Sequence, residues 1–121
     1  MFLCLLACTE KLGVENIRDI PDTNFKASYS FEPYSTYGPH KARLNGQGVP
    51  WHVPGSIPNP WIQVDNGYLT NVTGLLTQGY TWGGVGCWIT KLKVSTFTVA
   101  DDQEEVFIED ENGADKVFIR L

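Results

Sequence analysis

The sequence contains few of the residues that carry catalytic or metal chemistry. Its two histidines, His40 and His52, accompany three cysteines, Cys4, Cys8 and Cys87, which show no paired Cys-x-x-Cys spacing, and this argues against a zinc site. No G-x-S-x-G, phosphate-cradling loop or H-E-x-x-H motif is present. No stretch approaches the roughly 18 apolar residues that a membrane-spanning helix needs. We therefore predict a protein that is not an enzyme and has no catalytic residues.

Positive charge is also scarce, and the excess of negative charge lies at one end of the chain. Residues 1–100 carry seven Lys or Arg against six Asp or Glu, whereas residues 101–121 carry two against eight. Without a basic stripe to neutralise phosphates, nucleic acid is not an expected partner. The acidic residues miss the spacing of a calcium-binding loop, so we expect a solvated turn there. No cofactor or metal is predicted, and structural calcium stays an open alternative that no motif indicates.

The N-terminal residues differ in composition from the rest of the chain. Residues 1–7 are apolar, yet they lack a basic segment and are shorter than the ~15–30 residues of a signal peptide. We interpret them as a leader remnant, and residues 8–121 as one domain, because a chain of 121 residues supports a single hydrophobic core. Asn71, Val72 and Thr73 form an N-glycosylation sequon with Asn71 as acceptor, which is compatible with secretion.

Alternating polar and apolar residues predict an all-β protein. The pattern is seen at residues 25–29, 61–65, 72–77, 88–94, 106–108 and 116–121. Twelve glycines and seven prolines favour turns between short strands, and no window predicts a long helix. Asn112 and Gly113 form a hairpin signal between the last two predicted strands. Trp61 and Trp88 begin predicted strands, so we expect both to pack in the sheets.

Three aromatic-rich segments between the strands are the candidate binding loops. They are residues 30–39, 49–60 and 79–87, and their Pro, Gly and Ser content disfavours regular structure. Loops of this length usually carry function. We predict that their aromatic tips form one ligand surface, because aromatics give a large contact area at small entropic cost. The predicted ligand-binding residues are Phe31, Pro33, Tyr34, Trp51, Tyr80 and Trp82. The alternative is that these aromatics simply pack against neighbouring loops.

Six short motifs follow one another in a distinctive order. They are Cys8-Thr9-Glu10-Lys11-Leu12-Gly13-Val14-Glu15, Gly38-Pro39-His40-Lys41-Ala42-Arg43-Leu44-Asn45, Trp61-Ile62-Gln63-Val64-Asp65, Val72-Thr73-Gly74, Thr77-Gln78-Gly79 and Trp88-Ile89-Thr90-Lys91. Together they resemble the discoidin, or coagulation factor 5/8 type C, domain family from Cys8 to about Phe118. Arg43 and Asp65 occur in two of these motifs, and we expect them to form a partly buried ion pair that fixes loop and strand.

The resemblance implies an antiparallel β-sandwich of the jelly-roll, galactose-binding-like kind, with long loops at one end. Family members have no catalytic residues and hold anionic phospholipid, glycan, collagen or other protein ligands. Because the three loops contain no Lys or Arg, we expect an extracellular cell-adhesion module that recognises glycan or protein. The alternatives are a module that binds anionic phospholipid surfaces and an ancillary sugar-binding domain of a larger secreted enzyme. The expected location is secreted, or the extracellular face of a membrane protein.

The sequence departs from the family pattern at its C-terminal end. Family domains continue past the Val117-Phe118 strand through final strands to a closing cysteine, which pairs with the opening one. By the resemblance Cys8 is the opening cysteine of a disulfide whose partner is absent from the chain. We therefore expect a domain that is incomplete at its C-terminus, lacks its final strands and folds poorly. The lost bridge forfeits up to roughly 4–5 kcal/mol of stability. The states of Cys4 and Cys87 stay open.

Overall fold

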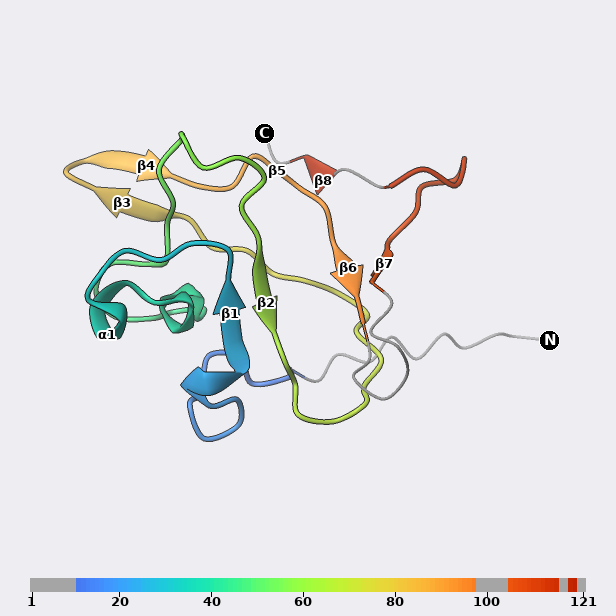
Figure 1. Ribbon diagram of the computed structural model, residues 1–121, viewed down its shortest axis with the longest axis horizontal. Coiled ribbons are helices and arrows are strands. Elements are labelled where there is room, and N and C mark those ends of the chain that lie inside the picture. The colour runs from blue at the N-terminus through green and yellow to red at the C-terminus, as the bar shows by residue number, and fades with distance from the viewer. Residues whose placement is uncertain (1–10, 98–104, 116–117, 120–121) are drawn as a thin grey trace. The chain divides into compact units, whose positions relative to one another are not determined.

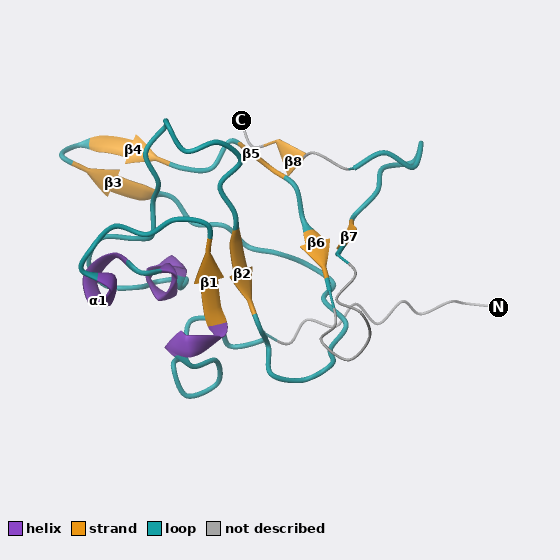
Figure 2. Ribbon diagram, viewed as in Figure 1, coloured by secondary structure: helices purple, strands orange, loops and turns teal. Residues whose placement is uncertain are grey.

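The computed structural model describes residues 11–97, 105–115 and 118–119 (Figure 1). The leader at residues 1–7, together with Cys4 and Cys8, lies outside the described residues. The chain divides into two compact units, Met1–Gln78 and Gly79–Leu121. Each unit contains short antiparallel strands joined by long irregular segments, and Figure 2 shows the strands in orange.

The first unit is organised around one pair of strands. Strand β1 (Phe25–Ala27) pairs antiparallel with β2 (Ile62–Val64), with Phe25 opposite Val64. Both strands fall inside segments predicted from the alternating pattern, and both are shorter than predicted. Burial alternates along β1 as the pleat requires, with Phe25 buried and Lys26 exposed. The pairing is a confirmed part of the predicted β structure.

Three single-turn helices complete the regular structure of the first unit. They are η1 (Asp22–Asn24), α1 (Tyr34–Tyr37) and η2 (Pro39–Ala42). The segment 30–39 was predicted to be irregular, whereas its second half forms α1 and leads into η2. Pro39 stands at the first position of η2, where its fixed φ suits a helix and its missing N–H costs nothing. These turns place the first aromatic loop next to η1.

The core of the first unit is small. Among the residues of this unit that the structure describes, the buried side chains are Ile20, Phe25 and Pro39. The Arg43 guanidinium covers this group, with its carbon 4.6 Å from the centroid of the Phe25 ring. Stacking a delocalised cation on an aromatic face keeps the ring from water while the donor groups stay free to bond.

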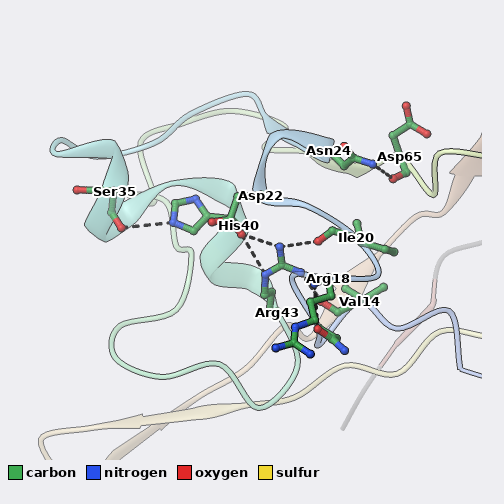
Figure 3. Close-up of polar contacts among 10 residues, drawn as sticks. Val14, Arg18, Ile20, Asp22, Asn24, Ser35, His40, Arg43 and Asp65 are labelled. Atoms are coloured by element: carbon green, nitrogen blue, oxygen red, sulfur yellow. Dashed lines mark hydrogen bonds and ion pairs between the residues drawn. The ribbon is translucent and has the colours of Figure 1, made fainter.

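The donors of Arg43 join three separate points of the chain (Figure 3). Nη1 donates to the carbonyl of Val14 at 2.8 Å, and Nη2 donates to the carbonyl of Ile20 at 2.7 Å. Nη2 also lies 2.6 Å from Oδ1 of Asp22, to which Nε donates at 3.3 Å. The Arg43 side chain is only 11% exposed. A nearly buried charge is thus neutralised and hydrogen-bonded at once.

The predicted ion pair between Arg43 and Asp65 is wrong, because the carboxylate partner of Arg43 is Asp22. Asp65 is exposed, and its Oδ1 accepts a hydrogen bond from the backbone N–H of Gly67 at 2.8 Å. Its carbonyl accepts a bond from the side chain of Asn24. Asp65 therefore shapes the turn after β2, and its position next to β1 comes from backbone pairing.

The second unit consists of three short antiparallel pairs. Strand β3 (Tyr80–Trp82) pairs with β4 (Val85–Cys87), β5 (Lys91–Leu92) pairs with β8 (Phe118–Ile119), and β6 (Ser95–Thr96) pairs with β7 (Val106–Phe107). Strands β5, β7 and β8 lie within predicted segments. The β3–β4 hairpin occupies residues 79–87, which were predicted to be a loop without regular structure.

The turn at Asn112 and Gly113 forms, although its flanking strands find other partners. Gly113 has a φ of 78° and donates its N–H to the carbonyl of Asp110 at 3.1 Å. Asp110 Oδ1 accepts bonds from the backbone N–H groups of Asn112 and Ala114. One isolated bridge joins Glu109 to Asp115. Because β7 pairs with β6 and β8 with β5, the predicted long hairpin reduces to a tight, exposed acidic turn.

Two further expectations about the strands are not met. Residues 72–77 form no strand. Trp61 and Trp88 lie outside the strands and are 50% and 53% exposed, so neither is a sheet-packing core residue.

The fold class is β, in small antiparallel sheets, and among the described residues no sheet has more than two strands. A closed two-sheet sandwich is not seen there.

Arg43→Ala is expected to lower the free energy of unfolding by about 2–4 kcal/mol, because it leaves two carbonyls without donors and uncovers Phe25. Arg43→Lys should recover little, since a single ammonium cannot replace a forked donor. Urea unfolding measures both. The control is Arg18→Ala, an exposed arginine, with an expected change within about 0.5 kcal/mol. Equal losses at the two arginines would contradict the role assigned to Arg43.

Candidate ligand-binding surface

Phe31 lies at the centre of an aromatic cluster and is half-buried. Its ring centroid is 5.1 Å from that of Tyr29 and 5.0 Å from that of His52, and the Tyr37 ring lies 6.3 Å away. Edge-to-face and tilted contacts of this kind stabilise aromatic pairs beyond the area they bury. Phe31 therefore joins the first aromatic loop to the second, and little of its ring is left for a ligand.

Trp51 has a similar position in the second aromatic loop. It is half-buried, and its indole N–H donates to the carbonyl of Tyr29 at 2.9 Å. A buried indole usually finds such a partner. The hydrogen bond anchors the second loop to the residues that follow β1. Phe31 and Trp51 thus hold the two loops against each other.

Pro33 and Tyr34 face the solvent. Tyr34 is the first residue of α1 and is 49% exposed, and its backbone N–H donates to Oε2 of Glu32 at 3.0 Å. Its ring centroid is 5.7 Å from that of His40. The Nε2 of His40 in turn lies 3.3 Å from the carbonyl of Ser35. These contacts fix the Tyr34 ring while leaving about half of the side chain free.

A shallow hollow of about 360 Å³ lies beside Tyr34. It is lined by Asp22, Thr23, Tyr34, Ser35 and His40. The lining combines an aromatic face with two hydroxyls and a carboxylate, and Asp22 also holds Arg43. Aromatic faces and a few converging polar groups are the usual content of a small-molecule site.

The β3–β4 hairpin presents the second exposed aromatic group. Tyr80 and Trp82 stand on one strand with ring centroids 6.4 Å apart, and Trp82 is 58% exposed. Val85 begins the return strand and is 65% exposed. The turn between them is Gly83 and Gly84, both with positive φ, as a tight two-residue hairpin turn of this type requires. Residues 79–87 contain no charged side chain, so the tip presents exposed apolar groups without charge.

The structure sorts the six predicted ligand residues by exposure. Phe31 and Trp51 are half-buried, whereas the other four are exposed, with Pro33 and Tyr34 in the first unit and Tyr80 and Trp82 in the second. Sequence reasoning missed Val85 and the polar lining of the hollow. The Gly83-Gly84 pair between β-forming residues was the available signal for the hairpin. No local signal placed Asp22 or Thr23 next to Tyr34.

The part of the chain that the structure describes includes the predicted glycosylation site and one of the three cysteines. Asn71 lies at the surface, and Cys87 is an exposed free thiol on β4. In the described ranges no three His, Cys, Asp or Glu side chains gather in a way that could hold a metal ion. None of the helices there is long and apolar enough to cross a membrane.

Comparison with known proteins identifies the family. The model of the F5/8 type C domain matches residues 24–115, most of the chain. The chain belongs to the F5/8 type C domain family. This match confirms the discoidin resemblance of the motifs, and the matched domain is a non-catalytic binding domain.

The chain spans less than a third of the length of each of the following relatives. This F5/8 type C domain is 34% identical to mouse lactadherin over 120 residues, which cover 94% of the chain and 25% of the mouse protein. It is 34% identical to human coagulation factor VIII over 121 residues, covering 94% of the chain and 5% of that protein. Pig lactadherin is 31% identical over 121 residues, which cover 96% of the chain and 29% of the pig protein. No solved structure shows a significant match.

Phe31→Ala is expected to lower the free energy of unfolding by about 1–2 kcal/mol, because it removes three ring contacts at a half-buried site. Tyr34→Ala should change it by no more than about 0.5 kcal/mol, since that ring is largely exposed. Denaturant unfolding of both variants distinguishes loop packing from ligand presentation. A larger loss at Tyr34 than at Phe31 would reverse the roles given to the two rings.

Proposed function

We propose that this F5/8 type C domain is an extracellular binding module that docks on membranes containing anionic phospholipid, with the β3–β4 hairpin as the inserting element. The observation that carries the proposal is the exposed, uncharged hairpin tip, which presents Tyr80, Trp82 and Val85 around two glycines. Anionic phospholipid is among the ligands that the family resemblance implies, and lactadherin and coagulation factor VIII contain the matching regions.

The hairpin has the physical properties of an interfacial anchor. Trp and Tyr favour the boundary between lipid headgroups and acyl chains, where the ring is apolar and the N–H or O–H remains hydrated. Trp82 and Val85 flank the turn and are the most exposed apolar residues of the hairpin. Burying an exposed side chain of this size contributes about 1.5–3 kcal/mol. Because β3 and β4 are paired, the tip loses little conformational entropy on binding.

Charge has a secondary part in this docking. Lys91 on β5 is exposed and is the cation next in sequence to the hairpin, and a basic residue near an anionic surface contributes about 1 kcal/mol. Lys93 already contacts Asp115 at 3.1 Å. The many acids at residues 101–121 oppose attraction to an anionic membrane. Insertion of apolar side chains is therefore the main source of affinity, with Lys91 favouring anionic headgroups.

The scaffold of the proposed module is the jelly-roll sandwich that the family implies. In that arrangement long loops project from one end of two packed sheets. A membrane-bound domain of this kind, as part of a longer secreted protein, gives that protein a place of attachment on a cell surface. This is the adhesive role that we infer for the chain.

Trp82→Ala is expected to weaken binding to vesicles containing phosphatidylserine about tenfold, which corresponds to about 1.4 kcal/mol. Sedimentation of the protein with vesicles measures the effect. Trp61→Ala is the matched control, because Trp61 is an exposed tryptophan outside the three aromatic segments, and it should leave vesicle affinity unchanged. Equal losses at both tryptophans, or no vesicle binding by the unsubstituted protein, would rule out the hairpin as the anchor.

The hollow beside Tyr34 supports a second candidate function, the recognition of glycan or of an extracellular protein. Its volume of about 360 Å³ is large enough for a small ligand, and its lining offers an aromatic face next to Thr23, Ser35 and Asp22. Sugar rings present both an apolar face and several hydroxyls, so this combination suits them. The chain would then serve as an adhesive domain, or as the sugar-binding part of a larger secreted enzyme.

Tyr34→Ala is expected to abolish any signal of the protein on a glycan array, because it removes the stacking face of the hollow. Tyr68→Ala serves as the control, since Tyr68 is 67% exposed and does not line the hollow. Glycan signals that survive Tyr34→Ala, or that disappear with Tyr68→Ala, would place sugar recognition elsewhere.

A further inference from the structure

Asn71 lies in a part of the first unit that has neither helix nor strand. Residues 69–78, here called the connector, follow β2 and its turn. The connector ends at Gln78, whose side chain forms a reciprocal pair with Asn45. Gln78 Oε1 accepts the Asn45 backbone N–H at 2.7 Å, and Gln78 Nε2 donates to Asn45 Oδ1 at 3.3 Å. This pair holds the C-terminal end of the connector to its own unit, and the connector residues are exposed except for the half-buried Thr70.

Asn71 is one of seven asparagines, and it alone is followed by a serine or threonine two positions later. The intervening residue is Val72, so the sequon is not blocked by proline. Asn71, Val72 and Thr73 are all exposed. N-linked glycans are bulky and belong on surface segments. The sequon and its exposure therefore both favour glycosylation at Asn71.

We propose that Asn71 carries an N-linked oligosaccharide when the chain passes through the secretory pathway, an inference that rests on the extracellular location in the proposed function. The transfer forms a bond between Asn71 Nδ2 and C1 of the oligosaccharide. It breaks the bond from that C1 to the diphosphate of a polyprenyl diphosphate donor. The lipid diphosphate leaves, and the amide nitrogen gives up one proton.

A glycan at Asn71 also constrains the membrane orientation, because it is compatible with docking only if the connector stays in water. Leu69 is 84% exposed and Val72 is 44% exposed, so the connector offers apolar side chains to the solvent. A glycan on Asn71 places many hydrated hydroxyls beside both residues, and moving these into lipid is strongly unfavourable. The modified connector therefore stays in water, and insertion is left to the β3–β4 hairpin.

The full chain, preceded by a cleavable secretory signal, is translated in the presence of endoplasmic-reticulum microsomes. The expected product is a protease-protected chain with added mass that a peptide N-glycosidase removes. Asn71→Gln abolishes the added mass, while Asn112→Gln, at an exposed asparagine outside a sequon, retains it. Thr73→Ser also retains it, because serine keeps the hydroxyl. A protected chain of unmodified mass would overturn the assignment, and this readout does not depend on binding to phosphatidylserine vesicles.

The membrane orientation is tested separately on protein that binds vesicles. The glycosylated protein and the Asn71→Gln protein should bind phosphatidylserine vesicles with affinities within about twofold of each other, since neither inserts the connector. A tenfold or larger gain without the glycan would show that the connector faces the lipid, and the proposed orientation would fail. The effect of Trp82→Ala on vesicle binding tests the proposed function and does not test whether Asn71 is glycosylated.

Discussion

The first unit depends on one guanidinium group. Arg43 covers the buried ring of Phe25 and donates hydrogen bonds to Val14, Ile20 and Asp22, which stand on different turns of the chain. With Ile20 and Phe25 as its buried hydrophobic side chains among the described residues, this unit has little apolar material to exclude water. A cation that bonds to two carbonyls and a carboxylate therefore contributes stability that a larger hydrophobic core supplies in other domains.

The same group connects the core to the candidate site. Asp22 accepts the bonds of Arg43 on one side and lines the hollow beside Tyr34 on the other. Its position is therefore fixed by an ion pair that is mostly buried on the arginine side. Because the ion pair fixes the carboxylate, the acceptor sites that Arg43 does not use point in one direction. A preorganised acceptor of this kind favours specific over nonspecific binding of a ligand in the hollow. The hollow thus receives its geometry from the core.

The alternation of apolar and polar residues was sufficient to predict β1. The apolar Phe25 is buried in the structure, and the charged Lys26 next to it is exposed. The same alternation at residues 72–77 produced no strand, since a strand exists only with a partner, and patterning does not supply one. The β3–β4 hairpin was missed for the converse reason. Its aromatic and glycine-rich composition is typical of loops, while Gly83 and Gly84 together allow the tight turn that pairs the strands.

Long-range contacts were the least predictable from sequence. Arg43 and Asp65 were paired because both stand in family-like motifs, yet the partner of Arg43 is Asp22, which belongs to none of them. The two acids are 43 residues apart in sequence, and only the fold decides which of them Arg43 can reach. The six motifs together did identify the family correctly. Motif order reports common ancestry, whereas the pairing of charges depends on a few ångströms of geometry.

The aromatic side chains show how one residue type serves two purposes in neighbouring loops. The Phe31 ring contacts those of Tyr29, Tyr37 and His52, and the Trp51 indole N–H donates to the Tyr29 carbonyl, so these contacts hold the first two loops together. Tyr34 and Trp82 lack such enclosure and keep about half or more of their surface in water. An exposed ring is useful for binding only if its support is rigid, because a mobile ring loses entropy when a ligand arrives. In the first unit the half-buried Phe31 and Trp51 support the loop that carries Tyr34, and in the second unit the paired strands support Trp82. Loop packing and the proposed ligand contacts therefore involve different rings, so the two interpretations of the aromatic segments do not exclude each other.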